Sequence, residues 1–366
     1  MTDEPTTPDA EEPQAAEDEA KPAFGKQQII AGIVTIIILI IVFAGVLPQL
    51  GDYGAAWEAI QNMAAWELGM IALATVAMIF IYALPFIAAM PGLAYWPAFK
   101  VRQTSFMISN TIPAGGAFGL AVQFGMLQSY GFGAAPSTAT IGITSVWNTF
   151  VTLTLPVLGL LGLAIIGQTN EQATTITLIA TTVVVVGIVL FALILRSEEL
   201  ARRIGGWADS AIQWFARLIK REITVDATKG IVDFRASIID VVSDRWLAIT
   251  AANVGQQLAQ YSILYLAVVA LQGSWVDPIG PWEALAAFSF GRLATFIPVP
   301  PGGLGTTDAL ITSILVGFGL DNNTALAATM IWRAATFFPQ VVIGGITLIA
   351  FQAERNRPGA QTPADT

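Results

Sequence analysis

Six stretches of the chain carry no charged side chain and are long enough to cross a bilayer. A transmembrane helix needs roughly 20 consecutive apolar residues. Because lipid offers the backbone no hydrogen-bonding partner, such stretches fold as helices that satisfy their own N–H and C=O groups. We therefore expect an all-α polytopic membrane protein. The uncharged stretches are 28–50, 68–99, 103–170, 172–195, 246–276 and 334–353.

The composition excludes most soluble and enzymatic classes. Only 12% of the 366 residues are charged, whereas soluble domains carry about 25%. The chain has no cysteine and no histidine, so it lacks thiol chemistry, the commonest metal ligand and the commonest general base. The expectation is a membrane protein that is not an enzyme and that has no cofactor and no metal site.

The net charge of −9 describes the N-terminal tail more than the membrane part. Residues 1–20 hold eight acidic side chains, three prolines and no basic residue, a composition typical of solvated, disordered chain. An acidic start is the opposite of a signal peptide, so the first apolar stretch is expected to remain as a span. The predicted organisation is an acidic tail at 1–25, a transmembrane domain at 26–353 and a second tail at 354–366.

Lysine and arginine predict the orientation in the membrane. Nine of the seventeen basic residues lie within 196–245, and most of the others flank the first spans or end the chain. Basic residues favour the cytoplasmic side. We therefore expect a plasma-membrane protein with both termini in the cytoplasm and a cytoplasmic linker at 197–245. The loops without any basic residue are 49–66, 167–172 and 272–281.

Two apolar segments contain breaks that divide them into helical hairpins. If all three segments between Lys100 and Arg196 crossed the bilayer, the basic cluster that begins at Arg196 would lie on the wrong side. Segment 103–131 is broken by TIPAGGAFG, and segment 282–320 is broken by PVPPGGLG. The pattern predicts about six full spans plus two re-entrant hairpins, the first entering from the cytoplasm and the second from outside. The alternative is eight ordinary transmembrane helices with kinks.

The two broken segments resemble each other. IPAGGAFG matches VPPGGLG with one inserted residue, and GFGAAPSTA at 131–139 matches GFGLDNNTA at 317–325. The predicted repeats cover about 100–166 and about 282–350, and they begin on opposite sides of the membrane. Inverted repeats whose broken helices meet near the bilayer midplane are frequent in secondary transporters, where they mark the binding site.

The second copy resembles a known family. Its sequence from FGRLATFIPVPPGGLGTTDAL through GFGLDNNTALAATMIWRAATFFPQVVIGG is similar to the flippase-like integral membrane family, which includes the transmembrane region of lysylphosphatidylglycerol synthases. The resemblance covers roughly residues 25–353 and implies movement of lipids or lipid-linked headgroups between leaflets. This chain has Asp308 where the family usually has Glu. Only 13 residues follow the last predicted span, so synthesis of an aminoacylated lipid is not expected.

The break in the second copy supplies the candidate binding site. Its glycines allow positive φ and a close approach of the backbone. Thr306 or Thr307 is expected to cap a half-helix that starts near Ala309, and the free N–H groups of a helix start favour an anion such as a lipid phosphate. The alternative is that Thr-Asp is only a well-capped helix start, in which Asp308 complements the helix dipole.

Two arginines lie inside apolar sequence. A charge in the membrane is costly, so an ionisable residue kept there indicates a function. Arg292 precedes the break and Arg333 follows the hairpin, and a guanidinium group can bind phosphate with two parallel hydrogen bonds. The alternative is a structural ion pair between Asp308 and one of these arginines. The predicted substrate-binding residues are Arg292, Pro301, Gly302, Gly303, Gly305, Thr307, Asp308 and Arg333.

The first copy lacks charged residues at the corresponding place. Its break and the following helix are expected to form the uncharged partner of the charged hairpin. The predicted partner residues are Pro113, Gly115, Gly116 and Gln123.

These observations lead to one expected function and two alternatives. The expected function is translocation of an anionic phospholipid or a lipid-linked glycan headgroup across the plasma membrane, with no nucleic-acid partner and with a separate synthase or glycosyltransferase as a candidate partner. The alternatives are an ion-coupled transporter of small solutes and a non-transporting scaffold for a membrane synthase. In the linker, WADSAIQWFARLIKREI predicts an amphipathic helix, either at the anionic leaflet or in solvent.

Overall fold

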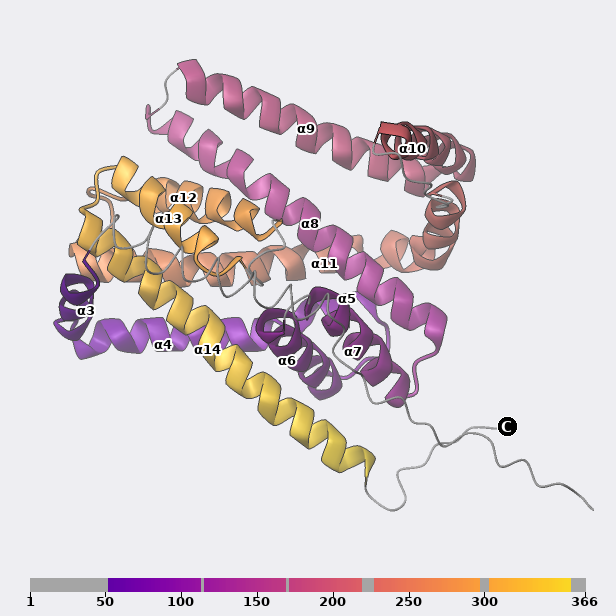
Figure 1. Ribbon diagram of the computed structural model, residues 1–366, viewed down its shortest axis with the longest axis horizontal. Helices are drawn as coiled ribbons and strands as arrows, with labels where there is room; N and C mark the ends of the chain where they lie inside the picture. Colours follow the sequence, from indigo (N-terminus) through magenta and orange to yellow (C-terminus); the bar gives the residue numbers. More distant parts are fainter. Residues whose placement is uncertain (1–51, 113–114, 169–170, 219–226, 297–302, 357–366) are drawn as a thin grey trace, which may run out of the picture.

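The chain is helical throughout the part that the structure describes (Figure 1). The structure is a computed structural model that describes residues 52–112, 115–168, 171–218, 227–296 and 303–356. The predicted span near 28–48 and both predicted tails, apart from the start of the second, lie outside these ranges. The elements are α3 (Tyr53–Gln61), α4 (Ala65–Ile81), α5 (Leu84–Ala89), α6 (Tyr95–Thr111), α7 (Gly115–Ser129), α8 (Ala134–Ile165), α9 (Glu171–Arg196), α10 (Glu198–Leu218), α11 (Ala227–Gln272), α12 (Pro281–Leu293), η2 (Ala294–Phe296), α13 (Thr306–Gly317) and α14 (Asn322–Arg355).

Contacts with the two ends of α14 define the two ends of the bundle. At one end Lys100 forms an ion pair with Glu354, and the Tyr130 ring meets the edge of Phe351 with centroids 5.6 Å apart. Burial and the Glu354 carboxylate raise the pKa of Tyr130 to about 12, so this phenol stays neutral. We call this the Lys100 end. At the other, the Asp321 end, the backbone N–H of Asp52 donates to Asn323 Oδ1 at 2.9 Å.

Four helical segments of the described residues are long and apolar enough to cross a membrane. They agree with four of the predicted spans, and the predicted span 172–195 corresponds to α9. One boundary was wrong: the last span begins at Asn322 rather than near 334. The helix starts early because Asp321 caps it, and because the buried charge of Arg333 is neutralised inside it. The four segments are Ala65–Ala89, Ala134–Ile165, Ile238–Gln272 and Asn322–Arg355.

Exposed tryptophans gather near both ends of the bundle. Such belts are typical of the two membrane–water interfaces, where the indole ring is partly in lipid and partly in water. The belts therefore support a bundle that spans the bilayer from the Asp321 end to the Lys100 end. Trp57, Trp66, Trp275 and Trp282 lie toward the Asp321 end, and Trp96 and Trp246 lie toward the Lys100 end.

Each predicted hairpin is a pair of packed helices. The chain enters and leaves the hairpin at the same end of the bundle. The first hairpin, α6 and α7, has Lys100 and Tyr130 at the Lys100 end. The second hairpin, α12, η2 and α13, starts and finishes at the Asp321 end, where Gly319 lies near Pro278. The hairpins therefore enter from opposite ends, as the charge distribution predicts (Figure 1).

The two repeats pack crosswise. Helix α14 of the second repeat packs on α6 of the first, where a Cβ atom on Gly344 would lie 2.5 Å from the Gln103 carbonyl oxygen. Helix α8 of the first repeat packs on α12 of the second, where a Cβ on Gly159 would lie 2.9 Å from Ala286 Cα. Glycine therefore allows both long helices to approach the opposite hairpin closely.

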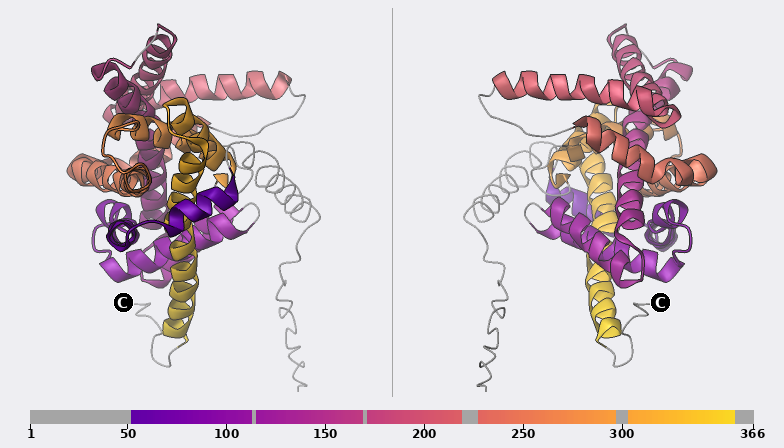
Figure 2. Two further views of the ribbon diagram at one scale, coloured as in Figure 1. Left: turned by 90° about the vertical axis from the view of Figure 1, so that its left-hand side faces the viewer. Right: turned by 90° about the vertical axis from the view of Figure 1, so that its right-hand side faces the viewer.

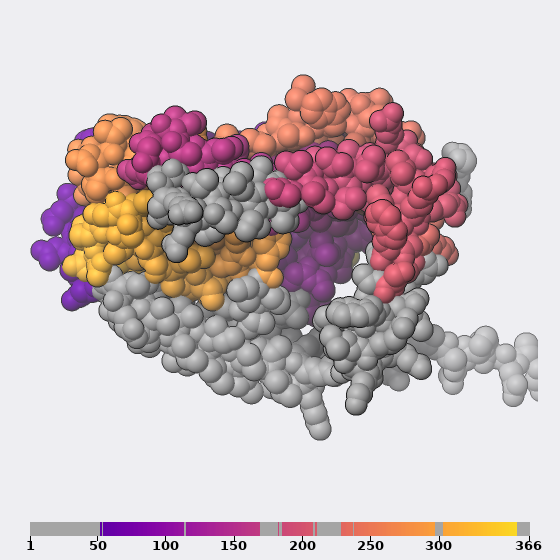
Figure 3. Space-filling view, turned by 90° about the horizontal axis from the view of Figure 1, so that it is seen from above, coloured from indigo at the N-terminus to yellow at the C-terminus, as the bar shows by residue number. Residues whose placement is uncertain are grey.

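Helices α9, α10 and the first part of α11 form a layer against this core. Helix α9 lies at the surface over α8 (Figure 3), and α10 runs crosswise to α14 (Figure 2). Arg235 donates to the Leu195 carbonyl and Arg245 to the Ile87 carbonyl, which fixes this layer at the Lys100 end. Helix α11 continues without a break from Ala227 into the membrane span.

Candidate functional site

The second hairpin turns sharply where its second helix begins. Gly303 and Gly305 have φ values of 63° and 80°, which only glycine adopts without strain. The prediction that Thr306 or Thr307 caps a helix near Ala309 was wrong. Gly305 is the N-cap and α13 starts at Thr306, because the positive φ of Gly305 lets the chain turn into the helix before the threonines.

Asp308 holds this helix start together. Its Oδ2 accepts a 2.7 Å hydrogen bond from the Gly305 N–H, and its Oδ1 accepts one from Arg333 Nε at 2.7 Å. The two side chains are 6% and 15% exposed, so their charges are largely removed from water. Both structural alternatives for Asp308, the helix cap and the ion pair, are therefore present together in the structure.

Arg333 connects the long span to the turn of the hairpin. Besides Asp308, its guanidinium reaches the Gly303 carbonyl at 3.5 Å and lies 4.9 Å from the centre of the Trp332 ring. Trp332 is itself buried and donates from Nε1 to the Gln260 carbonyl on α11. The side chain of Arg333 is thus fixed on several sides, and Asp308 neutralises its charge.

Arg292 is different, because no described residue provides an anion for it. Its Nε atom is buried without a hydrogen-bond partner, and no ion pair joins it to the described part of the chain. Arg292 lies in the last turn of α12, on the first arm of the hairpin whose turn Arg333 reaches at the Gly303 carbonyl. A cation that is partly removed from water, without an anion to pair with, is electrostatically costly. The arrangement therefore favours a negatively charged group near Arg292.

Tyr82, which no sequence pattern singled out, contacts another arginine of the membrane part, Arg102. The Arg102 guanidinium lies 4.5 Å from the centre of the Tyr82 ring, and its Nε donates to the Tyr82 carbonyl at 3.4 Å. Tyr82 stands at the junction of α4 and α5, and Pro85 just after it breaks the apolar stretch. That proline is the sequence signal that could have identified this position.

The remaining predicted residues divide between the two hairpins and the undescribed loops. Thr307 is fully buried, and its hydroxyl has no partner among the described residues. Pro113, Pro301 and Gly302 lie outside the described ranges. The structure thus brings Gly303, Gly305, Thr307, Asp308 and Arg333 together, and it places Arg292 in the last turn of α12, on the other arm of the same hairpin.

The predicted partner residues of the first copy lie in the other hairpin. Gln123 is buried and donates to Ser105 Oγ, which donates in turn to the Gly119 carbonyl, so Gln123 closes the hairpin. A Cβ atom on Gly115 would lie 2.8 Å from the Ser109 carbonyl oxygen, whereas the space beside Gly116 is open. A role in substrate binding stays a prediction for these residues.

The described part of the site contains cations and a turn, and no cluster that could hold a metal ion occurs among the described residues. Of the three arginines Arg102, Arg292 and Arg333, only Arg333 forms an ion pair with an acidic residue of the described chain, Asp308. An arrangement with more positive than negative charge can bind an anion by direct hydrogen bonds, without covalent chemistry.

Comparison with known families gives one match that covers most of the chain. The family model described as "Lysylphosphatidylglycerol synthase TM region" matches residues 28–344. The match includes both hairpins, helix α8, helix α14 as far as Gly344 and all the predicted site residues. A comparison with curated proteins finds no match.

Proposed function

The chain belongs to the family of the lysylphosphatidylglycerol synthase transmembrane region, and from this premise we propose that it moves an anionic lipid, or the anionic headgroup of a lipid-linked molecule, between leaflets. The proposed binding site is the turn of the second hairpin with Arg292 and Arg333. The proposed role is transport without covalent chemistry, in the plasma membrane and with both termini in the cytoplasm. A separate synthase would supply the lipid.

The observation that carries the proposal is the unpaired charge of Arg292. A charged side chain within a membrane span costs about 2.5–3.5 kcal/mol on insertion scales. Asp308 offsets that cost for Arg333, but no described residue offsets it for Arg292. A phosphate group would offset it, since guanidinium and phosphate match in charge and geometry. Among the described residues the site therefore has an unpaired cation that an anion would balance.

The arrangement of the hairpins supports access from both leaflets. The first hairpin opens at the Lys100 end and the second at the Asp321 end, so each end has a broken helix that reaches into the membrane. A central site between two such repeats can face either side when one repeat rocks against the other. Arg102, on α6 of the first repeat, contacts the Tyr82 ring and forms no ion pair with a described acid, so it is a further cation that would attract an anion.

The test is reconstitution of the full chain in phosphatidylcholine vesicles that contain fluorescent phosphatidylglycerol. A membrane-impermeant quencher reports how much of the probe has moved from the inner to the outer leaflet. We expect faster movement than in protein-free vesicles, and loss of that movement in Arg292→Gln. Arg203→Gln is the matched control, because Arg203 is an exposed arginine paired with Glu199 away from the hairpins.

Two results would contradict the proposal. One is movement of the probe at the protein-free rate by well-folded wild-type chain, with several anionic lipids tried. The other is full activity of Arg292→Gln. Arg292→Lys refines the result: activity near that of the wild type would show that positive charge suffices, and low activity would show that the planar guanidinium is needed.

A further inference from the structure

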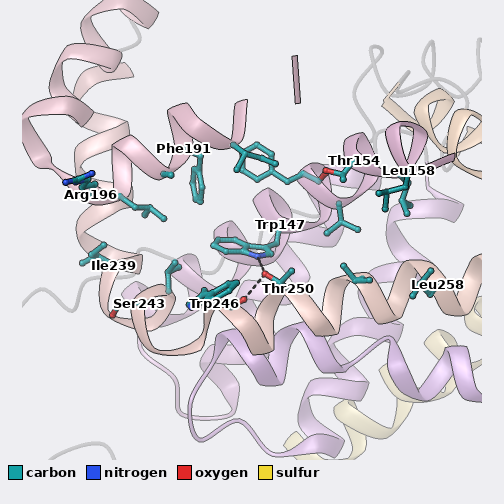
Figure 4. Close-up of a pocket in the computed structure, with 18 of the residues that line it drawn as sticks. Trp147, Thr154, Leu158, Phe191, Arg196, Ile239, Ser243, Trp246, Thr250 and Leu258 are labelled. Atoms are coloured by element: carbon teal, nitrogen blue, oxygen red, sulfur yellow. Dashed lines mark hydrogen bonds between the residues drawn. The ribbon is translucent and has the colours of Figure 1, made fainter. Parts of the chain in front are cut away.

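A long groove lies between α8, α9 and α11, and no residue of the two hairpin turns lines it (Figure 4). Its volume is about 820 Å³, and its far end touches α12 at Leu285. Several lining residues, among them Leu158, Ile188 and Leu258, are exposed, so the groove is an open cleft in the membrane-facing surface rather than a closed void. We call it the α8–α9–α11 groove.

The inner walls of the groove present almost only carbon. The polar atoms in its middle satisfy one another: Trp147 Nε1 donates to Thr250 Oγ1 at 2.9 Å, and Thr250 Oγ1 donates to the Trp246 carbonyl at 2.7 Å (Figure 4). Thr154 Oγ1 likewise donates to the Phe150 carbonyl. Ordered water needs polar partners, and none of these groups is left to bind it. The groove therefore suits hydrocarbon.

The rim of the groove at the Lys100 end is polar and carries a cation. Arg196 lies there, and the two nearest acids in sequence are engaged elsewhere, because Glu198 pairs with Arg202 and Glu199 with Arg203. Ser243 faces the same rim and bonds to the Asp240 carbonyl and to Asp244 Oδ1. Among the described residues no acid forms an ion pair with Arg196, so its charge is available to a ligand.

The dimensions of the groove fit one lipid leaflet. From Ser243 to Leu258 helix α11 rises about 22 Å at 1.5 Å per residue. One leaflet is about 20–22 Å thick including its headgroup region, half of a bilayer of about 40–45 Å. Trp246, which lines the groove beside the rim, is 55% exposed, as expected for a side chain at the membrane interface.

We propose that the α8–α9–α11 groove is a binding site for an anionic phospholipid from the leaflet at the Lys100 end. The acyl chain lies along the apolar wall formed by residues such as Phe150, Leu158 and Leu258, and the phosphate pairs with Arg196 at the rim. The groove matches an acyl chain because its walls are apolar. It matches a phosphate because Arg196, the basic residue among those that line it, lies at one end. Binding here does not depend on the proposed transport.

The test uses full-length protein in phosphatidylcholine vesicles that contain a small fraction of phosphatidylglycerol with a photoactivatable group on its acyl chain. After irradiation, mass spectrometry of peptides locates the label. We expect label concentrated in the lining segments 147–158, 188–196 and 239–258 rather than spread over all lipid-facing helices. Phosphatidylcholine with the same acyl chain, tested separately, should label the groove about fivefold less, the effect of one arginine near the interface.

Two pairs of variants separate the apolar wall from the charged rim. Ala192→Trp fills the groove from α9 and should lower labelling there several-fold, whereas Val189→Trp, at an exposed position of the same helix outside the lining, should not. Arg196→Gln should remove the preference for phosphatidylglycerol, and Arg203→Gln should keep it. If Ala192→Trp does not insert, Leu258→Trp fills the groove from α11 instead.

Three outcomes would overturn the proposal. The first is equal labelling of the groove in wild type and in the two filling variants. The second is an unchanged lipid preference in Arg196→Gln. The third is a change of oligomeric state in Ala192→Trp without a change in labelling, which would mean that a second copy of the chain covers the groove. Labelling does not require transport, so a transport-defective Arg292→Gln protein should label as the wild type does.

Discussion

Arg333 Nε donates to Asp308 Oδ1 at 2.7 Å, and this ion pair fastens the middle of α14 to the first turn of α13. The same carboxylate accepts from the Gly305 N–H, so one acidic side chain holds both the turn of the second hairpin and the neighbouring span. Neutralisation within the pair leaves Arg292 as the partly buried cation of this site that lacks an anion among the described residues. The pair and Arg292 should therefore respond differently to mutation.

Breaking the Asp308–Arg333 pair should destabilise the protein. Removing one partner of a desolvated ion pair leaves an uncompensated charge, which typically costs about 3–5 kcal/mol. We expect Asp308→Asn and Arg333→Gln each to lower the unfolding temperature in detergent, and the double variant to recover most of it. Arg292→Gln should unfold near the wild-type temperature, since it breaks no ion pair with a described residue.

The flux assay on the same proteins completes this comparison. If Arg333 acts mainly through the ion pair, the double variant Asp308→Asn, Arg333→Gln should recover transport along with stability. If Arg333 itself binds the headgroup, stability should return and transport should not. Normal stability of Asp308→Asn would contradict a structural role of the pair.

The sequence indicated which charged residues matter but not how they pair. Arg292, Asp308 and Arg333 are conspicuous because charge is rare in apolar stretches, whereas pairing depends on how α12, α13 and α14 pack in space. Tyr82 was missed because an aromatic residue in a span is ordinarily a packing residue, and its contact with Arg102 joins segments that no local pattern relates. The cap at Gly305 was missed because threonine is the usual cap, and Asp308 compensates for a cap without a side chain.

Adjacent glycines of α14 should differ sharply in their tolerance of a methyl group. A Cβ atom on Gly344 would lie 2.5 Å from the Gln103 carbonyl oxygen and would collide with Met107. Gly344→Ala should therefore force α14 away from α6 and cost about 1–3 kcal/mol. At Gly345 nothing lies within 4 Å, so Gly345→Ala should gain up to about 1 kcal/mol from helix propensity.

Thermal unfolding of the two alanine variants beside the wild type measures this difference. Equal unfolding temperatures for Gly344→Ala and Gly345→Ala would mean that α14 and α6 do not pack as closely as the structure shows.

The hairpins themselves were predictable from the sequence, and their crosswise packing was not. The positive-inside distribution required two segments that do not cross, and the Pro-Gly breaks identified them. The contact of each long helix with the other repeat's hairpin depends on small residues such as Gly159 and Gly344, which look the same in sequence as solvent-facing or lipid-facing glycines. The early start of α14 was missed because Arg333 suggested the end of an apolar segment, although Asp308 neutralises it.

The re-entrant geometry predicts which positions share a side of the membrane. Because the native chain has no cysteine, single cysteines can be introduced without background. We expect Ser129→Cys at the end of α7 and Gln352→Cys near the end of α14 to react with an impermeant maleimide from one side only, and Asn322→Cys from the opposite side only. Labelling of residue 129 from the same side as residue 322 would show that the first hairpin is a full span.

The cap of α14 should make stability depend on pH in the acidic range. Burial alone would raise the pKa of Asp321, but hydrogen bonds from Thr324 and from the Asn323 backbone outweigh burial and lower the pKa below its ordinary value of 3.8. A carboxylate with a lowered pKa stabilises the folded state fully above its unfolded pKa, and that stabilisation is lost as the pH falls through the folded pKa. Wild type should therefore lose stability more steeply below about pH 4 than Asp321→Asn does.

Asp321→Asn is the informative variant because asparagine caps a helix about as well as aspartate but does not titrate. Unfolding temperatures of the two proteins should run parallel from neutral pH down to about pH 5 and diverge below it. Asp321→Ala should be less stable than both at neutral pH, by about 1 kcal/mol, since it loses the bonds to the N–H groups of Asn323 and Thr324. Parallel curves for wild type and Asp321→Asn down to pH 3 would show that the Asp321 carboxylate does not stabilise the start of α14 through its charge.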